Sequence, residues 1–147
     1  HAEKTQLVCF AKPNRLSDDS RKRGTFDFLG FTHYWAKTRQ GFSVIKKKTA
    51  GNRLRRFMKA MWVWCKESLH DPITEQWKTP KAKLRGYYQY YGVRWNSDCL
   101  DLVHYTVERA WRYWLNRRGG RKMTWQRYGR LKARFPLPRP KIVQAWV

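Results

Sequence analysis

Acidic residues are scarce in this sequence: ten Asp and Glu stand against 33 Lys and Arg among 147 residues, for a formal net charge of +23. A folded domain gains no stability of its own from such an excess, because like charges repel one another in the compact state. The imbalance therefore predicts a polyanionic partner, and nucleic acid is the leading class. The nine tryptophans and the aromatic content of 16% exclude a disordered basic tail and predict a packed core.

Cysteines and long apolar runs are scarce as well. Cys9, Cys65 and Cys99 lie far apart and form no CxxC pair, which argues against zinc and fits reduced thiols in a cytoplasmic protein. The sequence has no run of about 18 apolar residues and no secretory apolar segment, so it predicts neither a transmembrane helix nor a signal peptide. Because the chain opens at His1 rather than at a methionine, we expect a fragment or the tail of a longer protein.

The residue patterns of a self-contained enzyme are also missing. None of the four histidines has a second histidine or cysteine at ligand spacing, and His104 fits a core position. No nucleophile elbow and no glycine-rich phosphate loop is found. Asp18 and Asp19 are adjacent, but they lie in a polar loop beside cations, and no third acid follows to complete a two-metal site. We therefore expect no catalytic residue, no metal ligand and no cofactor in this chain.

The first third of the chain has the pattern of β-strands. A short apolar run over residues 5–11 and an alternating segment over 25–38 predict strands, and residues 39–41 predict a hairpin turn into a further strand over 42–49. These segments together predict a small antiparallel unit.

From Thr49 the apolar spacing changes to about 3.6 residues, which predicts helices. The first helix has an apolar stripe that includes Trp62, and the second is predicted to begin at about Pro80, because Thr79 resembles an N-cap before a proline at N1. The third starts near Ser97 and the fourth follows Thr124, with Trp125 facing inward. The expected fold is α+β, with a small antiparallel β unit over 1–48 and a bundle of about four α-helices over 49–147.

Basic residues are most concentrated over 46–59, where seven cations occur in fourteen residues without one acid, which favours phosphate contacts. Gly86 on an outward helical position suggests close approach of another backbone, either a helix or RNA. Outward rings, Tyr90 and also Trp64 and Tyr113, are suited to stacking on unpaired bases. The expected RNA-binding residues are Lys46, Lys47, Lys48, Arg53, Arg55, Arg56, Lys59, Lys81, Arg85, Tyr90, Arg109 and Arg112.

The order of three segments, "HAEKT", "FDFLGF" and "LRGYYQYYG", resembles a known family over nearly the whole chain. It is similar to the C-terminal part of bacterial group II intron reverse transcriptase–maturases, from the last palm strands through the thumb, or maturase-specific domain X. The resemblance implies that 1–48 is the end of the palm, with a primer-grip hairpin containing Phe28, Leu29, Gly30 and Phe31, and that 49–147 is the thumb. It also implies binding of structured intron RNA to support splicing, and of RNA/DNA template–primer during RNA-directed DNA synthesis.

The same resemblance implies that the family's fingers, catalytic aspartates and Mg²⁺ belong to a part preceding this chain. We therefore expect this chain to be inactive as a polymerase alone and to have the missing N-terminal portion as a partner, in the cytoplasm and without a membrane. Two alternatives stay open. One is a stand-alone basic RNA-binding protein of ribosomal or chaperone type, and the other is a membrane-active cationic helical protein.

Overall fold

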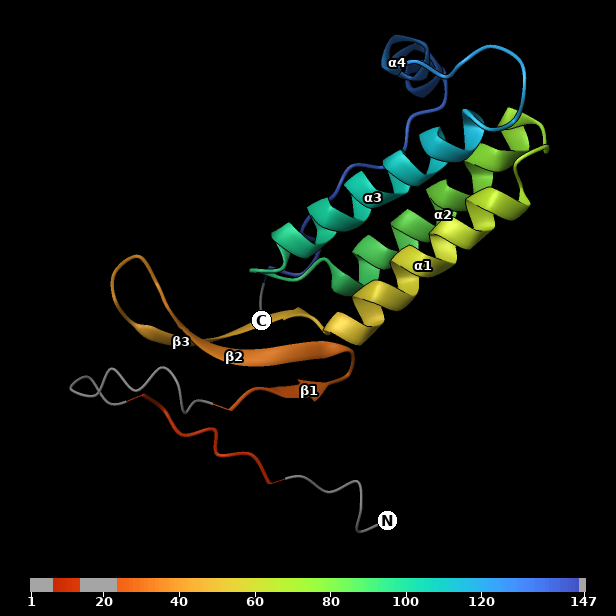
Figure 1. Cartoon of the computed structure of the whole chain (residues 1–147). Coiled ribbons are helices and arrows are strands. Elements are labelled where there is room, and N and C mark those ends of the chain that lie inside the picture. Colours follow the sequence, from red (N-terminus) through yellow and green to blue (C-terminus); the bar gives the residue numbers. More distant parts are fainter. Residues whose placement is uncertain (1–6, 14–23, 146–147) are drawn as a thin grey trace.

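The computed structural model describes residues 7–13 and 24–145, and in this part three strands precede four helices (Figure 1). The strands β1 (Phe26–Phe28), β2 (Phe31–Lys37) and β3 (Ser43–Thr49) form one antiparallel sheet in the order β1-β2-β3. The helices are α1 (Gly51–Glu67), α2 (Ile73–Tyr91), α3 (Ser97–Leu115) and α4 (Trp125–Arg134). The α+β fold expected from the sequence is confirmed.

The segment "FDFLGF" is not part of one continuous strand, as its alternation predicted, but folds back at Leu29 and Gly30. Both residues have positive φ angles, 51° and 82°, which is the geometry of a tight two-residue hairpin turn. Phe28 and Phe31 are consequently paired across the turn. Glycine is required at position 30, since a Cβ there would also lie 2.9 Å from the hydroxyl oxygen of Tyr91. The next hairpin, between β2 and β3, lies where the sequence predicted it.

The prediction of a strand over residues 5–11 is wrong for residues 7–11, which the structure describes. Leu7 is fully exposed, and residues 7–13 form no ladder with the described strands. The segment instead contacts the sheet through Phe10, whose ring packs 4.8 Å from that of Phe26 and 5.6 Å from that of Trp35. Side-chain packing thus accounts for its apolar pattern without strand pairing. Asp18 and Asp19 lie outside the described residues.

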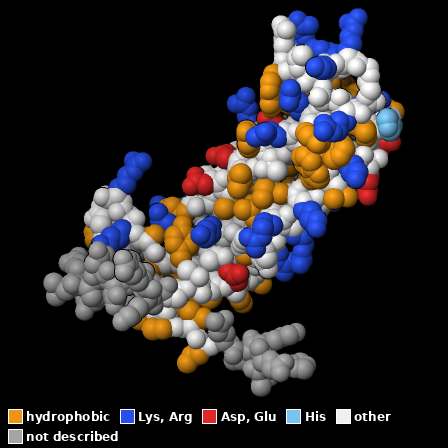
Figure 2. Space-filling model, viewed as in Figure 1, with side chains coloured by type: hydrophobic (Ala, Val, Ile, Leu, Met, Phe, Trp, Pro, Cys, Tyr) orange, Lys and Arg blue, Asp and Glu red, His pale blue; other side chains and the backbone are white. Residues whose placement is uncertain are grey.

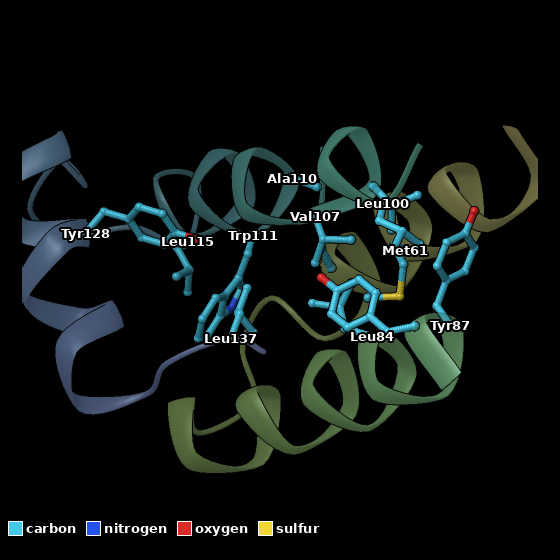
Figure 3. Close-up of a cluster of buried hydrophobic side chains, with 13 residues drawn as sticks. Met61, Leu84, Tyr87, Leu100, Val107, Ala110, Trp111, Leu115, Tyr128 and Leu137 are labelled. Atoms are coloured by element: carbon cyan, nitrogen blue, oxygen red, sulfur yellow. The ribbon is translucent and has the colours of Figure 1, made fainter. Parts of the chain in front are cut away.

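The core lies between the helices, where α1, α2 and α3 run alongside one another (Figure 1). Its buried side chains come from all four helices and the C-terminal tail (Figure 3) and are Met61, Cys65, Leu84, Tyr87, Tyr88, Leu100, Val103, Val107, Ala110, Trp111, Leu115, Tyr128 and Leu137. Trp111 is completely buried, and its Nε1 donates a hydrogen bond to Gln76 Oε1 at 3.0 Å. The apolar stripes read from the sequence therefore do meet in one interior.

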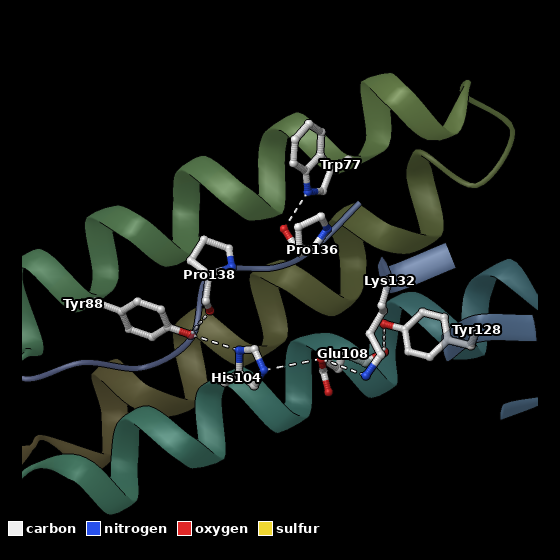
Figure 4. Close-up of polar contacts among 8 residues, drawn as sticks. All are labelled: Trp77, Tyr88, His104, Glu108, Tyr128, Lys132, Pro136 and Pro138. Carbon is white, nitrogen blue, oxygen red and sulfur yellow. Dashed lines mark hydrogen bonds and ion pairs between the residues drawn. The ribbon is translucent and has the colours of Figure 1, made fainter. Parts of the chain in front are cut away.

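The predicted start of the second helix at about Pro80 is wrong. Helix α2 begins at Ile73, about two turns earlier, and Pro80 is buried within it. A proline inside a helix costs about 3 kcal/mol, but tertiary contacts hold the first turns in place. The amide of Gln76 donates to two backbone carbonyls of the α1–α2 turn at 2.9 and 3.2 Å. Trp77 Nε1 donates to the Pro136 carbonyl at 2.8 Å (Figure 4).

Two tryptophans expected to face inward lie at the surface instead. Trp62 is 38% exposed, and its ring covers the α1–α3 seam from outside, 4.8 Å from Tyr113 and 5.5 Å from Trp114. Trp125 is 59% exposed, because it is the first residue of α4 and Tyr128 takes the core position one turn later. Thr124 does cap this helix as expected, and its side chain accepts a hydrogen bond from the Arg127 N–H.

A chain of polar side chains joins α2, α3, α4 and the tail (Figure 4). The Tyr88 hydroxyl donates to the Pro138 carbonyl at 3.0 Å and lies 3.2 Å from His104 Nδ1. His104 Nε2 is 3.4 Å from the Glu108 carboxylate, which Lys132 also approaches at 3.0 Å. The hydrogen bond from His104, assisted by Lys132, outweighs burial and holds the pKa of Glu108 below its ordinary value.

A matched pair of tryptophan substitutions distinguishes core from surface. We expect Trp111→Ala to lower the free energy of unfolding by about 3–5 kcal/mol, because it leaves a cavity in a fully buried site. Trp62→Ala removes partly exposed packing and should cost about 1 kcal/mol. Chemical denaturation of both variants measures the two values, and equal losses would contradict the described burial.

The lowered pKa of Glu108 predicts an acid-sensitive part of the stability. Since the folded-state pKa lies below the ordinary value of 4.5, this contribution is present above that value and is lost as the pH falls through the folded-state pKa. We expect Glu108→Gln to lower the free energy of unfolding by about 1–3 kcal/mol at pH 7. Urea denaturation at successively lower pH should find this difference shrinking below pH 4.5, and a constant difference would refute the assigned role.

Candidate nucleic-acid interface

Lysine and arginine side chains cover the helical part of the molecule, and few of them meet an acid. Figure 2 shows them spread over the helices of this face, between apolar patches and with little acidic surface. Among the described residues, the ion pairs of Lys and Arg are Lys78–Glu75 at 2.8 Å and Lys132–Glu108 at 3.0 Å. The other cations in the described part of the chain form no salt bridge with a described acid.

The expected cations of α1 lie on its outer face. Helical spacing turns Met61 and Cys65 into the core, so the opposite side of the helix carries the exposed side chains Arg53, Arg55, Arg56 and Lys59. These four exposed side chains give the outer side of α1 its positive charge.

The three lysines of β3 do not form a single patch. Lys46 and Lys48 project to one side of the sheet and Lys47 to the other, because side chains alternate along a strand. Each ammonium group lies over an aromatic ring at a distance of 5.3–5.9 Å from the ring centroid: Trp95 for Lys46, Phe31 for Lys47 and Tyr34 for Lys48. The structure therefore divides this basic run between two surfaces.

A third basic region lies on α2 and the tail. The ammonium group of Lys81 is 4.0 Å from the ring centroid of Trp77. Arg85, one turn further along, lines a cavity of about 440 Å³ together with Arg139 and Lys141. The sequence did not identify these last two, since no local pattern indicates that the tail returns to α2.

Tyr90 is half exposed, and its phenol is held in place by the sheet. Its hydroxyl donates to the Leu29 carbonyl at 2.6 Å, and its ring stacks on that of Phe31 at 5.7 Å. The residues expected to form the primer-grip hairpin, 28–31, are thereby held against the C-terminal turn of α2. Of the other rings expected to point outward, Trp64 is half-buried against the core.

A group of arginines lies where α1, α3 and α4 meet, and the guanidinium group of each lies over an aromatic ring. The guanidinium carbon of Arg109 lies 5.3 Å from the ring centroid of Tyr105, and Arg109 Nη1 also donates to the Tyr105 hydroxyl at 2.9 Å. The corresponding ring distances are 3.9 Å for Arg112 over Trp125 and 4.0 Å for Arg117 over Tyr113. Together with Trp62 we call these residues the arginine–aromatic cluster: Trp62, Tyr105, Arg109, Arg112, Tyr113, Arg117 and Trp125.

A cavity of about 440 Å³ opens within this cluster, lined by Trp62, Tyr105, Thr106, Arg109, Ala110, Arg112, Tyr113 and Trp125. No acid is among these lining residues. Arg109 is exposed as expected, but Arg112 is half-buried rather than on the outer face. The Nε atom of Arg112 is buried and has no hydrogen-bond partner among the described residues. The cavity thus combines positive charge with aromatic rings.

Sequence reasoning identified Arg109, Arg112 and Tyr113 but not the cluster itself. One signal was present, because an arginine follows a tyrosine by four residues within α3, at Tyr105–Arg109, and again at its C-terminal end, at Tyr113–Arg117, where Arg117 lies two residues beyond the helix. Residues four apart on a helix are neighbours on its surface. Trp62 and Trp125 join the group only through the packing of three helices.

Within residues 7–13 and 24–145, no group of three or more His, Cys, Asp or Glu side chains is arranged to hold a metal ion. No helix in the described part is long and apolar enough to cross a membrane. No protein-family model matches the sequence, and comparison with curated proteins and with solved structures found no match. The interpretation of the interface therefore depends on its own geometry.

Gly86 lies beside Arg85 on the exposed face of α2, where the sequence left close approach of a helix or of RNA open. A Cβ at this position would meet nothing within 4 Å, so no described helix approaches it. We expect Gly86→Ala to raise the free energy of unfolding by about 0.5–1 kcal/mol, since alanine loses less backbone entropy in a helix. Thermal or urea denaturation measures the gain, and destabilisation would contradict the open surroundings of Gly86.

Proposed function

We propose that this chain binds structured RNA through its cationic surface, as the RNA-binding part of a group II intron reverse transcriptase–maturase in the cytoplasm. The observation that carries the proposal is the position of the lysines and arginines. The lysines and arginines in the described part of the chain lie outside a packed aromatic core, and of these only Lys78 and Lys132 pair with a described acid. Charge that is neither neutralised nor buried is available to phosphate groups.

The physical basis of such binding is the release of counterions from the RNA. Each phosphate neutralised by a lysine or arginine frees part of the condensed cation atmosphere, so affinity falls steeply with salt concentration. Exposed rings add stacking on unpaired bases, which favours single-stranded and loop regions over uniform duplex. Both contributions are available on the helices of this chain.

The intron-specific part of the proposal is supported by the residues that resemble the maturase family. In this proposal the segment "FDFLGF" forms the hairpin that positions a primer, and the helices hold intron RNA and template–primer. The catalytic aspartates and their Mg²⁺ belong to the preceding part of the polymerase, and no residue of this chain is assigned to that metal. The chain contributes binding and positioning to the reaction, and no chemical step.

The basic face of α1 provides the test. We expect Arg55→Ala with Arg56→Ala to weaken binding of the full chain to a folded intron RNA and to reduce the slope of log affinity against log salt by about 2, one unit per phosphate contact. Filter binding or fluorescence anisotropy over a range of salt concentrations measures the slope.

The matched control keeps the charge. Arg55→Lys with Arg56→Lys should retain the salt slope, because a lysine also neutralises one phosphate. An unchanged slope in the alanine variant would place the phosphate contacts on another face, and binding that does not respond to salt would overturn the proposed function altogether.

A further inference from the structure

We propose that the cavity of the arginine–aromatic cluster binds one unpaired nucleobase together with its phosphate. This inference rests on the proposed function, RNA binding, and assigns a particular part of the RNA to a particular site. The structure favours this occupant through the size of the cavity, the exposure of its rings and the charge around it.

The dimensions and lining suit a planar group. A volume of about 440 Å³ lies within the range of about 300–1,000 Å³ typical of small-molecule sites. Trp62 borders the cavity beside Tyr113, and Trp125 borders it beside Arg112. Rings of this kind offer flat faces on which any base can stack, whatever its sequence.

The rings are more exposed than packing requires. Trp125 is 59% exposed, Tyr105 is 53% exposed and Trp62 is 38% exposed. The interior position on α4 is filled by Tyr128, so the core is complete without Trp125. Large exposed rings gathered around one cavity mark an interaction site rather than a structural one.

The positive charge of the arginines around the cavity favours a planar ligand that is also an anion. Arg109 and Arg112 line the cavity, Arg117 stacks on Tyr113 at its border, and the lining contains no acid. A guanidinium that stacks through its face keeps its in-plane N–H groups for a phosphate, which it can bind in bidentate fashion. A nucleotide supplies a flat base and a phosphate together.

The experiment compares two single strands of about ten nucleotides, one carrying bases and one abasic, which have the same backbone charge. We expect the full chain to bind the base-bearing strand at least about fivefold more tightly than the abasic strand at equal salt. A difference of about fivefold corresponds to the lower end of the affinity gained by stacking one base on a ring. Trp125→Ala should abolish this preference, so that the base-bearing and abasic strands bind with equal affinity. Trp125→Phe should keep most of the preference, because phenylalanine also stacks.

The control is Phe42→Ala, which removes a ring that is 57% exposed in the β2–β3 turn, outside the cluster. This variant should keep the full preference. A second readout is photo-crosslinking of a strand carrying 5-iodouridine, which should attach to Trp62, Tyr113 or Trp125 and not to Phe42.

The outcomes separate this inference from the proposed function. Equal affinity of the wild type for both strands, with binding still sensitive to salt, overturns the base site and leaves RNA binding intact. A preference that survives Trp125→Ala also overturns it, because the bases then stack at another site. Loss of binding to both strands and to folded RNA in the wild type would refute the proposed function itself.

Discussion

The arrangement of strands and helices depends on one buried amide, that of Asn96. Its Oδ1 accepts the Thr49 N–H at 2.9 Å, and its Nδ2 donates to Thr49 Oγ1 at 2.9 Å and to the Tyr91 carbonyl at 2.8 Å. Thr49 ends β3, Tyr91 ends α2 and Asn96 precedes α3, so three segments meet at this side chain. Only a side chain that both donates and accepts hydrogen bonds can satisfy all three partners. A buried donor or acceptor left without a partner costs about 1–3 kcal/mol. This contact therefore ties the end of the sheet to the junction between α2 and α3.

The run of tyrosines in α2 serves the same junction. The Tyr87 hydroxyl reaches Thr49, and burial raises the pKa of Tyr87 to about 12, so the phenol remains a donor. Tyr90 holds the Leu29 turn, and Tyr91 lies against Gly30. Tyrosine suits such a seam because its ring packs with apolar groups while its hydroxyl bonds to a backbone or side chain of the neighbouring element. Tyr87, Tyr90 and Tyr91 thus attach the sheet to the end of α2.

Periodicity was sufficient to predict the fold class, the β2–β3 hairpin and the core positions of α3, because each depends on side chains within one segment. It failed where contacts between residues far apart in the sequence determine the structure. Pro80 resembles a helix start, yet Gln76 and Trp77 hold the preceding turns to α3 and to the tail. Trp62 fits an apolar stripe, yet its place at the edge of that stripe becomes visible only once α3 is packed beside it. The basic α1 face was predictable for the same local reason, whereas the cavity formed by α1, α3 and α4 was not.

The way in which the cations are held explains how so much charge coexists with a folded chain. A salt bridge holds a lysine or arginine in place but also neutralises its charge. An aromatic ring attracts the same cation through its quadrupole and leaves the positive charge unneutralised, and an exposed contact of this kind stabilises by about 0.5–1 kcal/mol. Lys81 on Trp77, Arg112 on Trp125 and Arg117 on Tyr113 are all held in the second way, within about 4 Å of a ring centroid. The abundant aromatic residues therefore do two things at once. They build the interior, and at its margin they hold cations that the described acids do not neutralise.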